Sequence, residues 1–330
     1  MPTKLGAHVI RMSGATLPFI TAGPAVVKFI GDWAAASDAP AGTLAIGRKV
    51  SDDDAQSQRS RGLSPAEAAN EFVYKWKQLE LYEQNPDIFF WEGHNESVWG
   101  DLEGISWYAQ MEIERMKLMD ALGLKCVIGN FASGSPPLHL WPGFVPACQY
   151  AVEHNHFLGL HEYSTPFMWW MTGKYQLDRS EDARTSDGRL TGWTTLRYRQ
   201  IYDQFLKPAG LGSLPLVITE CGLDPLVNPI PDGWPHGTYQ HLGGWWSKGP
   251  SVWGYPLPDD FVPDGGWHID NRDLFYLEQL QWYDYHLLQD SYVIGMTLFT
   301  FGSYGAPWDA FDVTLTEAAN LLTEYVKTHK

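Results

Sequence analysis

Apolar residues gather into eight short runs along the chain, and most of the runs end at a glycine or a polar residue. Most of the runs are continuous rather than alternating, which is typical of parallel strands that helices cover on their outer side. We therefore predict eight buried parallel strands. They span residues 5–11, 25–32, 44–50, 88–96, 125–133, 157–164, 216–222 and 293–303.

Helical patterns separate most of these runs. Ser64, Pro65 and Glu67 form a capping box with proline at the first helical position, which predicts a helix that starts there and runs to about residue 85. A second periodic stretch, 105–122, ends at Gly123, a typical helix stop. Further helices are predicted over 146–155, 194–206, 273–290 and 315–327. The first two connections, 14–23 and 33–43, are short and contain few good helix formers.

Eight alternations of strand and helix, without a linker or a low-complexity repeat, predict one α/β domain that covers residues 1–330. The pattern is that of a single (β/α)8 TIM barrel. A doubly wound open sheet is the alternative. The barrel is favoured because it uses all eight strands equivalently, whereas an open sheet needs a switch point.

One segment, residues 223–270, does not fit this alternation. It contains five tryptophans and many prolines and glycines, with little periodicity, so we expect a long aromatic-rich loop after the seventh strand and no regular element. Loops that follow barrel strands build the active face. We therefore expect a wall or lid that faces the substrate. A peripheral cap or an oligomer contact is the alternative.

Two glutamates close apolar runs that are far apart in the sequence. Glu96 ends the fourth run, directly after Asn95, and Glu220 ends the seventh. In a barrel both would point into the same mouth from opposite sides, and a carboxylate pair there is the minimum equipment for hydrolysing a glycosidic bond. The alternative is that both glutamates are ordinary solvent-exposed charges at strand ends. Two such residues, each at the end of a buried parallel strand, favour catalysis.

Three short motifs carry a resemblance to a known group of enzymes. They are Trp91-Glu92-Gly93-His94-Asn95-Glu96, His161-Glu162-Tyr163 and Ile218-Thr219-Glu220-Cys221-Gly222. With this strand order the chain resembles glycoside hydrolase clan A, whose members are retaining (β/α)8 glycosidases with an acid/base on strand four and a nucleophile on strand seven. The order of the strands matches the clan over nearly the whole chain, whereas the specific sequence similarity is limited to these short motifs. The resemblance does not identify a family within the clan.

The resemblance implies a role for each matching residue. Glu96 would be the acid/base and Glu220 the nucleophile. Asn95 would hydrogen-bond the sugar 2-hydroxyl, and His161 and Tyr163 would orient the nucleophile or the sugar. The retaining reaction makes its own demand: one carboxyl must be neutral and the other ionised, about 5 to 5.5 Å apart, whereas an inverting pair needs about 6.5 to 9.5 Å.

Other polar residues close strands and are candidates for the same mouth. His8 and Arg11 end the first run and Arg48 ends the third, so each could hold sugar hydroxyls or steady Glu220, although a structural ion pair is equally compatible. Asn130, near the end of the fifth run, is a comparable candidate. Trp308 follows the eighth run and could serve as a sugar platform, with core packing as the alternative.

Two further glutamates have structural interpretations. Glu92 lies four residues before Glu96, inside the strand, so we expect a buried ion pair. Glu162 points away from the side that His161 and Tyr163 share, because side chains alternate along a strand.

The composition of the chain limits the classes of molecule that it is expected to bind. A formal net charge of −16 argues against nucleic acid or an anionic membrane as the main partner, since both need a basic patch. No apolar run approaches the roughly 20 residues of a membrane helix. The surplus of rings, with 16 Trp, 16 Tyr and 15 Phe, indicates that some line an open surface suited to sugars. Nothing in the sequence predicts an oligomeric state.

Metals and cofactors are not expected. The three cysteines leave at least one thiol free, and the chain has no His-Glu-x-x-His motif, Cys-x-x-Cys pair or glycine-rich phosphate loop. The acidic run Asp52-Asp53-Asp54 lacks the distal glutamate of a calcium-binding EF-hand loop. These absences weigh against dehydrogenases and kinases, and the missing Gly-x-Ser-x-Gly elbow weighs against esterases.

The sequence thus predicts a retaining glycoside hydrolase that cleaves internal β-linkages of a polysaccharide, without a cofactor or a metal. The alternatives are a hydrolase of the bacterial cell-wall glycan on the same scaffold, a metal-dependent barrel hydrolase, and a carbohydrate-binding barrel without turnover. The chain shows no signal peptide, which is compatible with a cytoplasmic protein, or with an extracellular one after trimming or lysis.

Overall fold

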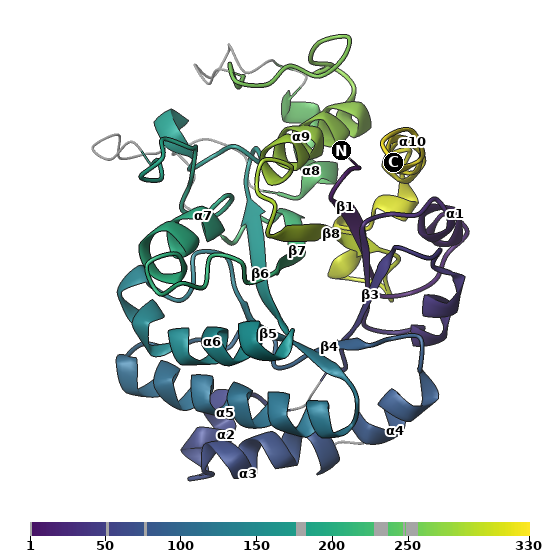
Figure 1. Ribbon diagram of the computed structural model, residues 1–330. Coiled ribbons are helices and arrows are strands. Elements are labelled where there is room, and N and C mark those ends of the chain that lie inside the picture. Colours follow the sequence, from purple (N-terminus) through teal and green to yellow (C-terminus); the bar gives the residue numbers. More distant parts are fainter. Residues whose placement is uncertain are drawn as a thin grey trace.

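The computed structural model describes residues 2–50, 53–75, 78–175, 183–227, 237–246, 248 and 257–330. Eight parallel strands close into a barrel in sequence order, β1 to β8, with β8 pairing back to β1 (Figure 1). The predicted (β/α)8 fold is confirmed. The strands are β1 Leu5–Val9, β2 Val26–Phe29, β3 Leu44–Gly47, β4 Phe90–Glu92, β5 Lys125–Phe131, β6 Phe157–Ser164, β7 Leu216–Leu223 and β8 Val293–Phe301.

Helices surround the barrel on its outer side (Figure 1). They are α1 Thr16–Thr21, α2 Ala55–Ser60, α3 Pro65–Asn70, α4 Gln78–Gln84, α5 Leu102–Ala121, α6 Val145–His154, α7 Tyr198–Ile201, α8 Tyr239–Trp246, α9 Arg272–Leu287 and α10 Ala318–Thr328. The helices predicted over 105–122, 146–155, 273–290 and 315–327 are therefore present, whereas the one predicted over 194–206 is reduced to the four-residue α7 and a π-helical turn, Tyr202–Leu206. The first two connections form only the six-residue α1 and a 3-10 turn, Trp33–Asp38, as their composition suggested.

The predicted capping box is present at the start of α3. The Ser64 hydroxyl accepts the backbone N–H of Glu67 at 3.3 Å, and the Glu67 carboxylate accepts the N–H of Ser64 at 2.9 Å. The helix does not continue unbroken to residue 85, because a π-helical turn, Glu71–Lys75, separates α3 from α4.

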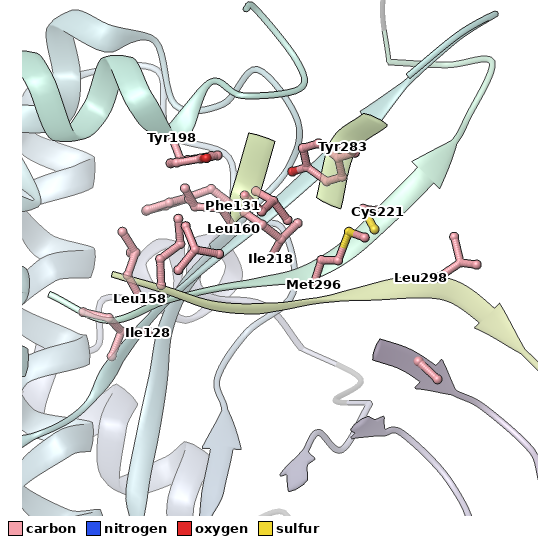
Figure 2. Packing of buried hydrophobic residues seen from close by; sticks show 14 of the residues in the cluster. Ile128, Phe131, Leu158, Leu160, Tyr198, Ile218, Cys221, Tyr283, Met296 and Leu298 are labelled. Carbon is pink, nitrogen blue, oxygen red and sulfur yellow. The ribbon is translucent and has the colours of Figure 1, made fainter. Parts of the chain in front are cut away.

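The outer face of the strands packs against the helices. Figure 2 shows Leu158, Leu160 and Ile218 of the strands beside Tyr198 of α7 and Tyr283 of α9. All five side chains belong to one continuous buried cluster. This layer removes most of the apolar surface of the barrel from water and fixes the strands against each other.

The interior of the barrel changes from apolar to charged along its axis. Val26, Ile46, Val127 and Val217 form a separate buried cluster inside the barrel. Two residues further along β2 the same face presents Lys28, because strand side chains repeat with a period of two. The apolar layer therefore closes the barrel from below, and the charged layer lies next to the carboxyl ends of the strands.

The segment after β7 corrects one prediction. No regular element was expected in residues 223–270, yet Tyr239–Trp246 forms α8. Trp245 packs against Phe167 and Trp246 against Phe275, with ring centroids 5.6 Å and 5.2 Å apart. These rings are buried because α8 lies on α9 and must cover an apolar face there. Two other tryptophans of the segment, Trp234 and Trp253, lie outside the described residues.

Among the described helices, none combines the length with the hydropathy that crossing a membrane would require.

Candidate active site

Glu96 and Glu220 face the same cavity at the carboxyl ends of the strands. The cavity has a volume of about 590 Å³, and both carboxylates line it. An oxygen of one carboxylate lies within 4.8 Å of an oxygen of the other. Their environments differ, since the Glu96 side chain is 39% exposed and the Glu220 side chain only 8%. The two groups are therefore close together but unequally solvated.

The backbone at Glu96 has an uncommon conformation. Its φ is 52°, in the left-handed region that few residues other than glycine adopt. The N–H of Glu96 donates to the carbonyl oxygen of Asn130 at 2.9 Å. Residues held in such regions persist only where their surroundings impose them. Here β5 imposes the conformation, and the side chain of Glu96 extends into the cavity.

Cationic side chains surround one oxygen of Glu220. Lys28 Nζ and an Arg48 guanidinium nitrogen each lie 2.9 Å from Oε1, and Nδ1 of His8 lies 3.5 Å away. Burial lowers the pKa of His8 well below its usual range, and Lys28 lowers it further, so His8 is neutral at pH 7. Lys28 and Arg48 therefore carry the positive charge at this oxygen.

The other oxygen of Glu220 is held by strand β6. The Tyr163 hydroxyl donates to Oε2 at 2.8 Å. Nδ1 of His161 lies 3.5 Å from Oε2 and 2.7 Å from Oε1 of Glu96, so His161 bridges the two glutamates. The hydroxyl of Tyr163 stays protonated, because burial and then the charge of Glu220 raise its pKa well above the usual range.

These contacts determine the protonation state of Glu220. Burial by itself would raise the pKa of its carboxyl, since the charged form loses water. The surrounding charges outweigh burial and hold the pKa of Glu220 well below its usual range. The side chains that lower it are His161, Lys28 and Arg48. Glu220 is therefore ionised at neutral pH, as an attacking carboxylate must be.

Lys28 is a site residue that the sequence analysis did not single out. It is fully buried in β2 and also contacts Glu92, at 3.0 Å. Glu92 forms the buried ion pair expected of it, with Lys28 and, at 3.8 Å, with Arg48. The available signal was a lysine inside the apolar sequence of Val26–Phe29. Such a lysine must meet an anion inside the protein.

The rim of the cavity includes residues from the loops after β8 and β7. Trp308, which is 46% exposed, and Tyr304, which is 67% exposed, line it from the loop after β8. The guanidinium of Arg11 lies over the Tyr304 ring, 5.8 Å from its centroid. Asp224, just past the neighbouring strand β7, also lines the cavity. The aromatic wall is therefore built after strand eight, whereas the described part of residues 223–270 contributes only Asp224 to the lining of this cavity.

Asp224 is a third carboxyl that sequence reasoning missed. Its Oδ1 accepts the backbone N–H of Leu226 at 2.9 Å. Burial raises the pKa of Asp224, and the negative charges of Glu96 and Glu220 raise it further. Since Asp residues are common after strands, no feature of the sequence distinguished this one.

The structure divides the seven predicted substrate-binding residues into two groups. Asn95, Tyr163, Arg48 and Trp308 line the cavity, and Arg48 donates to the side-chain oxygen of Asn95. His161, His8 and Asn130 lie behind the cavity surface. His161 and His8 reach Glu220 from there.

Asn130 does not hold the position expected of a substrate ligand. Its side chain is buried, donates to the carbonyl oxygen of Val127 at 3.1 Å and accepts from the Thr219 hydroxyl at 3.2 Å. The side chain turns inward because Gly159 of β6 leaves space for it; a methyl group at Gly159 would lie 2.2 Å from its oxygen. Asn130 thus supports Glu96 through its backbone carbonyl.

Glu162 lies on the opposite face of β6, as alternation required. Its carboxylate accepts the N–H groups of Leu196 and Tyr198 at 2.6 and 2.8 Å and the hydroxyl of Tyr283 at 2.6 Å. Glu162 therefore anchors the chain that leads into α7.

Among the described residues, one group of side chains has the spacing of a metal site: Glu96, His161 and Glu220. Lys28 and Arg48 already neutralise Glu220 at 2.9 Å. A metal ion at this point would meet two positive charges in a poorly solvated place. The arrangement suits an ionised nucleophile better than a cation site.

Several solved structures are similar to this chain. No protein-family model and no curated protein sequence matches the chain. The β-glucuronidase of Ruminococcus gnavus is 12% identical, with a TM-score of 0.51, over 98% of this chain and 50% of that one. An endo-β-1,3-glucanase of Amycolatopsis mediterranei, in complex with laminaritriose, is 12% identical with a TM-score of 0.46 over 98% and 99% of the two chains. A xyloglucan-specific endo-β-1,4-glucanase from a metagenomic library is 13% identical with a TM-score of 0.45 over 99% and 97%. The similarity to the β-glucuronidase is one of fold.

Proposed function

We propose that this protein is a retaining glycoside hydrolase that cleaves β-glycosidic bonds within a polysaccharide, and that residues 1–330 form its single catalytic domain. The observation that carries the proposal is the placement of Glu96 and Glu220, after β4 and at β7, with carboxylate oxygens within 4.8 Å of each other. Retaining pairs are separated by about 5 to 5.5 Å, and inverting pairs by about 6.5 to 9.5 Å. The short gap supports direct attack of Glu220 on the sugar rather than attack by a water held between Glu220 and the sugar.

In the first half of the reaction Glu220 is the nucleophile. Its ionised carboxylate attacks the anomeric carbon, while the bond from that carbon to the leaving oxygen breaks. Glu96 transfers its proton to the leaving oxygen, which departs as a neutral hydroxyl. The sugar is then bound to Glu220 as an ester, and Glu96 is ionised.

In the second half Glu96 acts as a base. It removes a proton from a water molecule, whose oxygen attacks the anomeric carbon, and the bond from that carbon to Glu220 breaks. The released sugar keeps its original configuration, and both carboxyl groups return to their starting states. The greater exposure of Glu96 supports this role, because the incoming water must reach it.

The shape of the surface supports action within a chain. A second hollow of about 310 Å³ adjoins the main cavity and shares Arg48, Val50 and Asn95 with it. Together the two hollows extend from the aromatic rim at Trp308 across the ends of β3 and β4. A continuous cleft accommodates sugar units on both sides of the cleaved bond, whereas an exo-acting enzyme closes one end.

Within this class the substrate is a carbohydrate, and β-glucan, mannan, xylan, galactan and cell-wall glycan are its candidates. The charge of −16 and the acidic carboxyls at the cavity disfavour nucleic acid and anionic membranes as partners. A binding barrel without turnover is disfavoured by the same pair of carboxylates, since such a protein has no need to keep both of them.

The test is a screen of β-glucan, mannan, xylan, galactan and peptidoglycan with the wild type, Glu96→Gln and Glu220→Gln. We expect one polymer to be cleaved by the wild type, with retention of anomeric configuration by NMR, and activity to fall by at least about 10³-fold in each variant. Azide should rescue Glu220→Ala and yield a glycosyl azide of inverted configuration.

A matched control is Glu112→Gln. Glu112 is a fully buried glutamate of α5 that pairs with Arg115 at 2.7 Å and does not line the cavity. It should affect stability without removing turnover. Full activity in both catalytic variants, or hydrolysis that inverts the anomeric centre, would overturn the proposal. Activity that a chelator removes would point to the metal-dependent alternative.

A further inference from the structure

Lys28 lies between two buried carboxylates at the base of the cavity. Its Nζ is 2.9 Å from Glu220 and 3.0 Å from Glu92, and it donates to the backbone carbonyl of Thr219 at 3.1 Å. Both the Lys28 and Glu92 side chains are completely buried. Arg48, directly after β3, also lies near both carboxylates, at 2.9 Å from Glu220 and 3.8 Å from Glu92. Each cation is thus shared by the two anions.

The cluster is balanced in charge before the reaction. Two cations, Lys28 and Arg48, face two anions, Glu92 and Glu220; Lys28 and Glu92 are completely buried, and Arg48 and Glu220 are only 10% and 8% exposed. The remaining titratable groups directed at Glu220 come from the other strands: His8 of β1, His161 and Tyr163 of β6, Glu96 after β4, and Asp224 after β7.

The proposed reaction disturbs this balance. When the oxygen of Glu220 gives its electron pair to the anomeric carbon, the carboxylate becomes a neutral ester. Without another anion, Lys28 and Arg48 would then be buried cations with no counter-charge, which is costly in a poorly solvated interior. Glu92 does not take part in bond formation and keeps its charge throughout.

We propose that Glu92 is a positioning residue that acts through Lys28 and Arg48: it draws part of their charge away from Glu220 and remains their counter-ion in the glycosyl-enzyme. The inference rests on the proposed function, because it requires Glu220 to be the nucleophile. Glu92 makes no contact with the cavity, so it affects the reaction only through the two shared cations.

Glu92→Gln tests the idea with almost no change of shape. With Glu92 neutral, Lys28 and Arg48 act on Glu220 alone and make it a weaker nucleophile, and the positively charged transition state loses a nearby anion. We expect kcat to fall by roughly 10- to 100-fold while KM stays within about twofold, since the change acts on the reacting charge and not on substrate contacts.

A pH profile separates this effect from loss of structure. In a Lys28→Met background, where the nearest cation is gone, the acid limb of kcat/KM should lie in a measurable range. Adding Glu92→Gln to that background removes an anion, so the limb should move down by about one pH unit. An acid limb at the same pH in Lys28→Met and in the double variant would overturn the inference.

Glu112→Gln serves again as the control, because it neutralises a buried, ion-paired glutamate on the outer side of β4 without reaching the cavity. It should lower the melting temperature without moving the acid limb. Retained activity in Glu220→Gln would remove the proposed function itself. A different outcome is possible, in which Glu220→Gln is inactive but adding Glu92→Gln to Lys28→Met does not move the acid limb of kcat/KM. That result would contradict the role of Glu92 and leave the proposed function intact.

Discussion

The hydroxyl of Tyr163 donates a hydrogen bond of 2.8 Å to Oε2 of Glu220, while Lys28 and Arg48 occupy the other oxygen of the same carboxylate. One oxygen is thus held by a neutral donor and the other by two cations. Since an ion pair at Oε1 restrains that oxygen more strongly, Oε2 is the oxygen better placed to attack a sugar. The hydrogen bond from Tyr163 orients Oε2 of Glu220.

Tyr163→Phe should lower kcat more than it raises KM. A hydrogen bond to a charged group contributes about 1.5 to 3 kcal/mol, which corresponds to roughly 10- to 100-fold in rate where it is made in the transition state. Steady-state kinetics on the identified polymer measure this. Tyr202→Phe is the matched control, because Tyr202 is a buried tyrosine whose hydroxyl donates to Leu214, away from the cavity. Equal losses in both variants would contradict a role at Glu220.

Trp308→Ala should weaken substrate binding. The exposed ring lines the cavity beside Phe299 and offers an apolar face to a sugar. Losing such an aromatic contact costs about 0.5 to 1.5 kcal/mol, so KM should rise by roughly 2- to 10-fold with little change in kcat. Trp193→Ala removes a ring of similar exposure, 42%, that does not line the cavity. An unchanged KM in Trp308→Ala would show that the ring is not a platform.

Gly159→Ala should impair catalysis from outside the cavity. The added methyl group would lie 2.2 Å from the Asn130 side-chain oxygen and displace the residue whose carbonyl holds the N–H of Glu96. We expect a loss of about 1 to 3 kcal/mol in the free energy of unfolding, together with a lower kcat. Chemical denaturation and kinetics measure the two effects. Gly14→Ala, which meets nothing within 4 Å, should change neither quantity; a full kcat in Gly159→Ala would mean that Asn130 does not position Glu96.

Buried histidines should make the protein less stable in acid. Burial lowers the pKa of His94 from 6.5 to about 3 in the folded state. Between these values the unfolded chain binds a proton that the folded protein does not, so the stability from this group is complete above pH 6.5 and is lost as the pH falls toward 3. His94→Gln can keep the hydrogen bond with Gln58 and should flatten the pH dependence of the melting temperature across that window.

The exposed His139 provides the comparison for this effect. His139→Gln makes the same substitution at an exposed position and controls for the exchange of histidine for glutamine as such. A slope in His94→Gln as steep as that in His139→Gln would contradict the assignment of the acid sensitivity to His94.

The barrel was predictable because a local pattern encodes it. Strands covered on their outer side need continuous apolar runs, and these runs can be read without knowing which residues they contact. The positions of Glu96 and Glu220 follow from strand number alone, since the carboxyl ends of all eight strands meet at one face. The buried ion pair of Glu92 followed from its position inside a strand, and the outward direction of Glu162 followed from alternation along its strand.

The roles of Lys28 and Asn130 could not be predicted from strand patterns, because they depend on contacts between strands. Lys28 finds its anions on β4 and β7, far from β2 in the sequence, so its role exists only once the barrel closes. Asn130 turns inward because Gly159 on the next strand leaves room for it. The tryptophans of α8 pack on α9 rather than facing the cavity, because that helix had an apolar face to cover.

By itself, then, the sequence determined the eight strands, their order and the two glutamates at strand ends. These features depend on the spacing of apolar residues and on the residues that end each run, which are properties of neighbouring positions in the chain. Only the tertiary structure decided which oxygen of Glu220 is neutralised, that Glu92 shares its cations, and that Tyr304 and Trp308 form the aromatic rim. Those features depend on side chains that approach across the barrel, and electrostatic interaction depends on distance in space rather than along the chain.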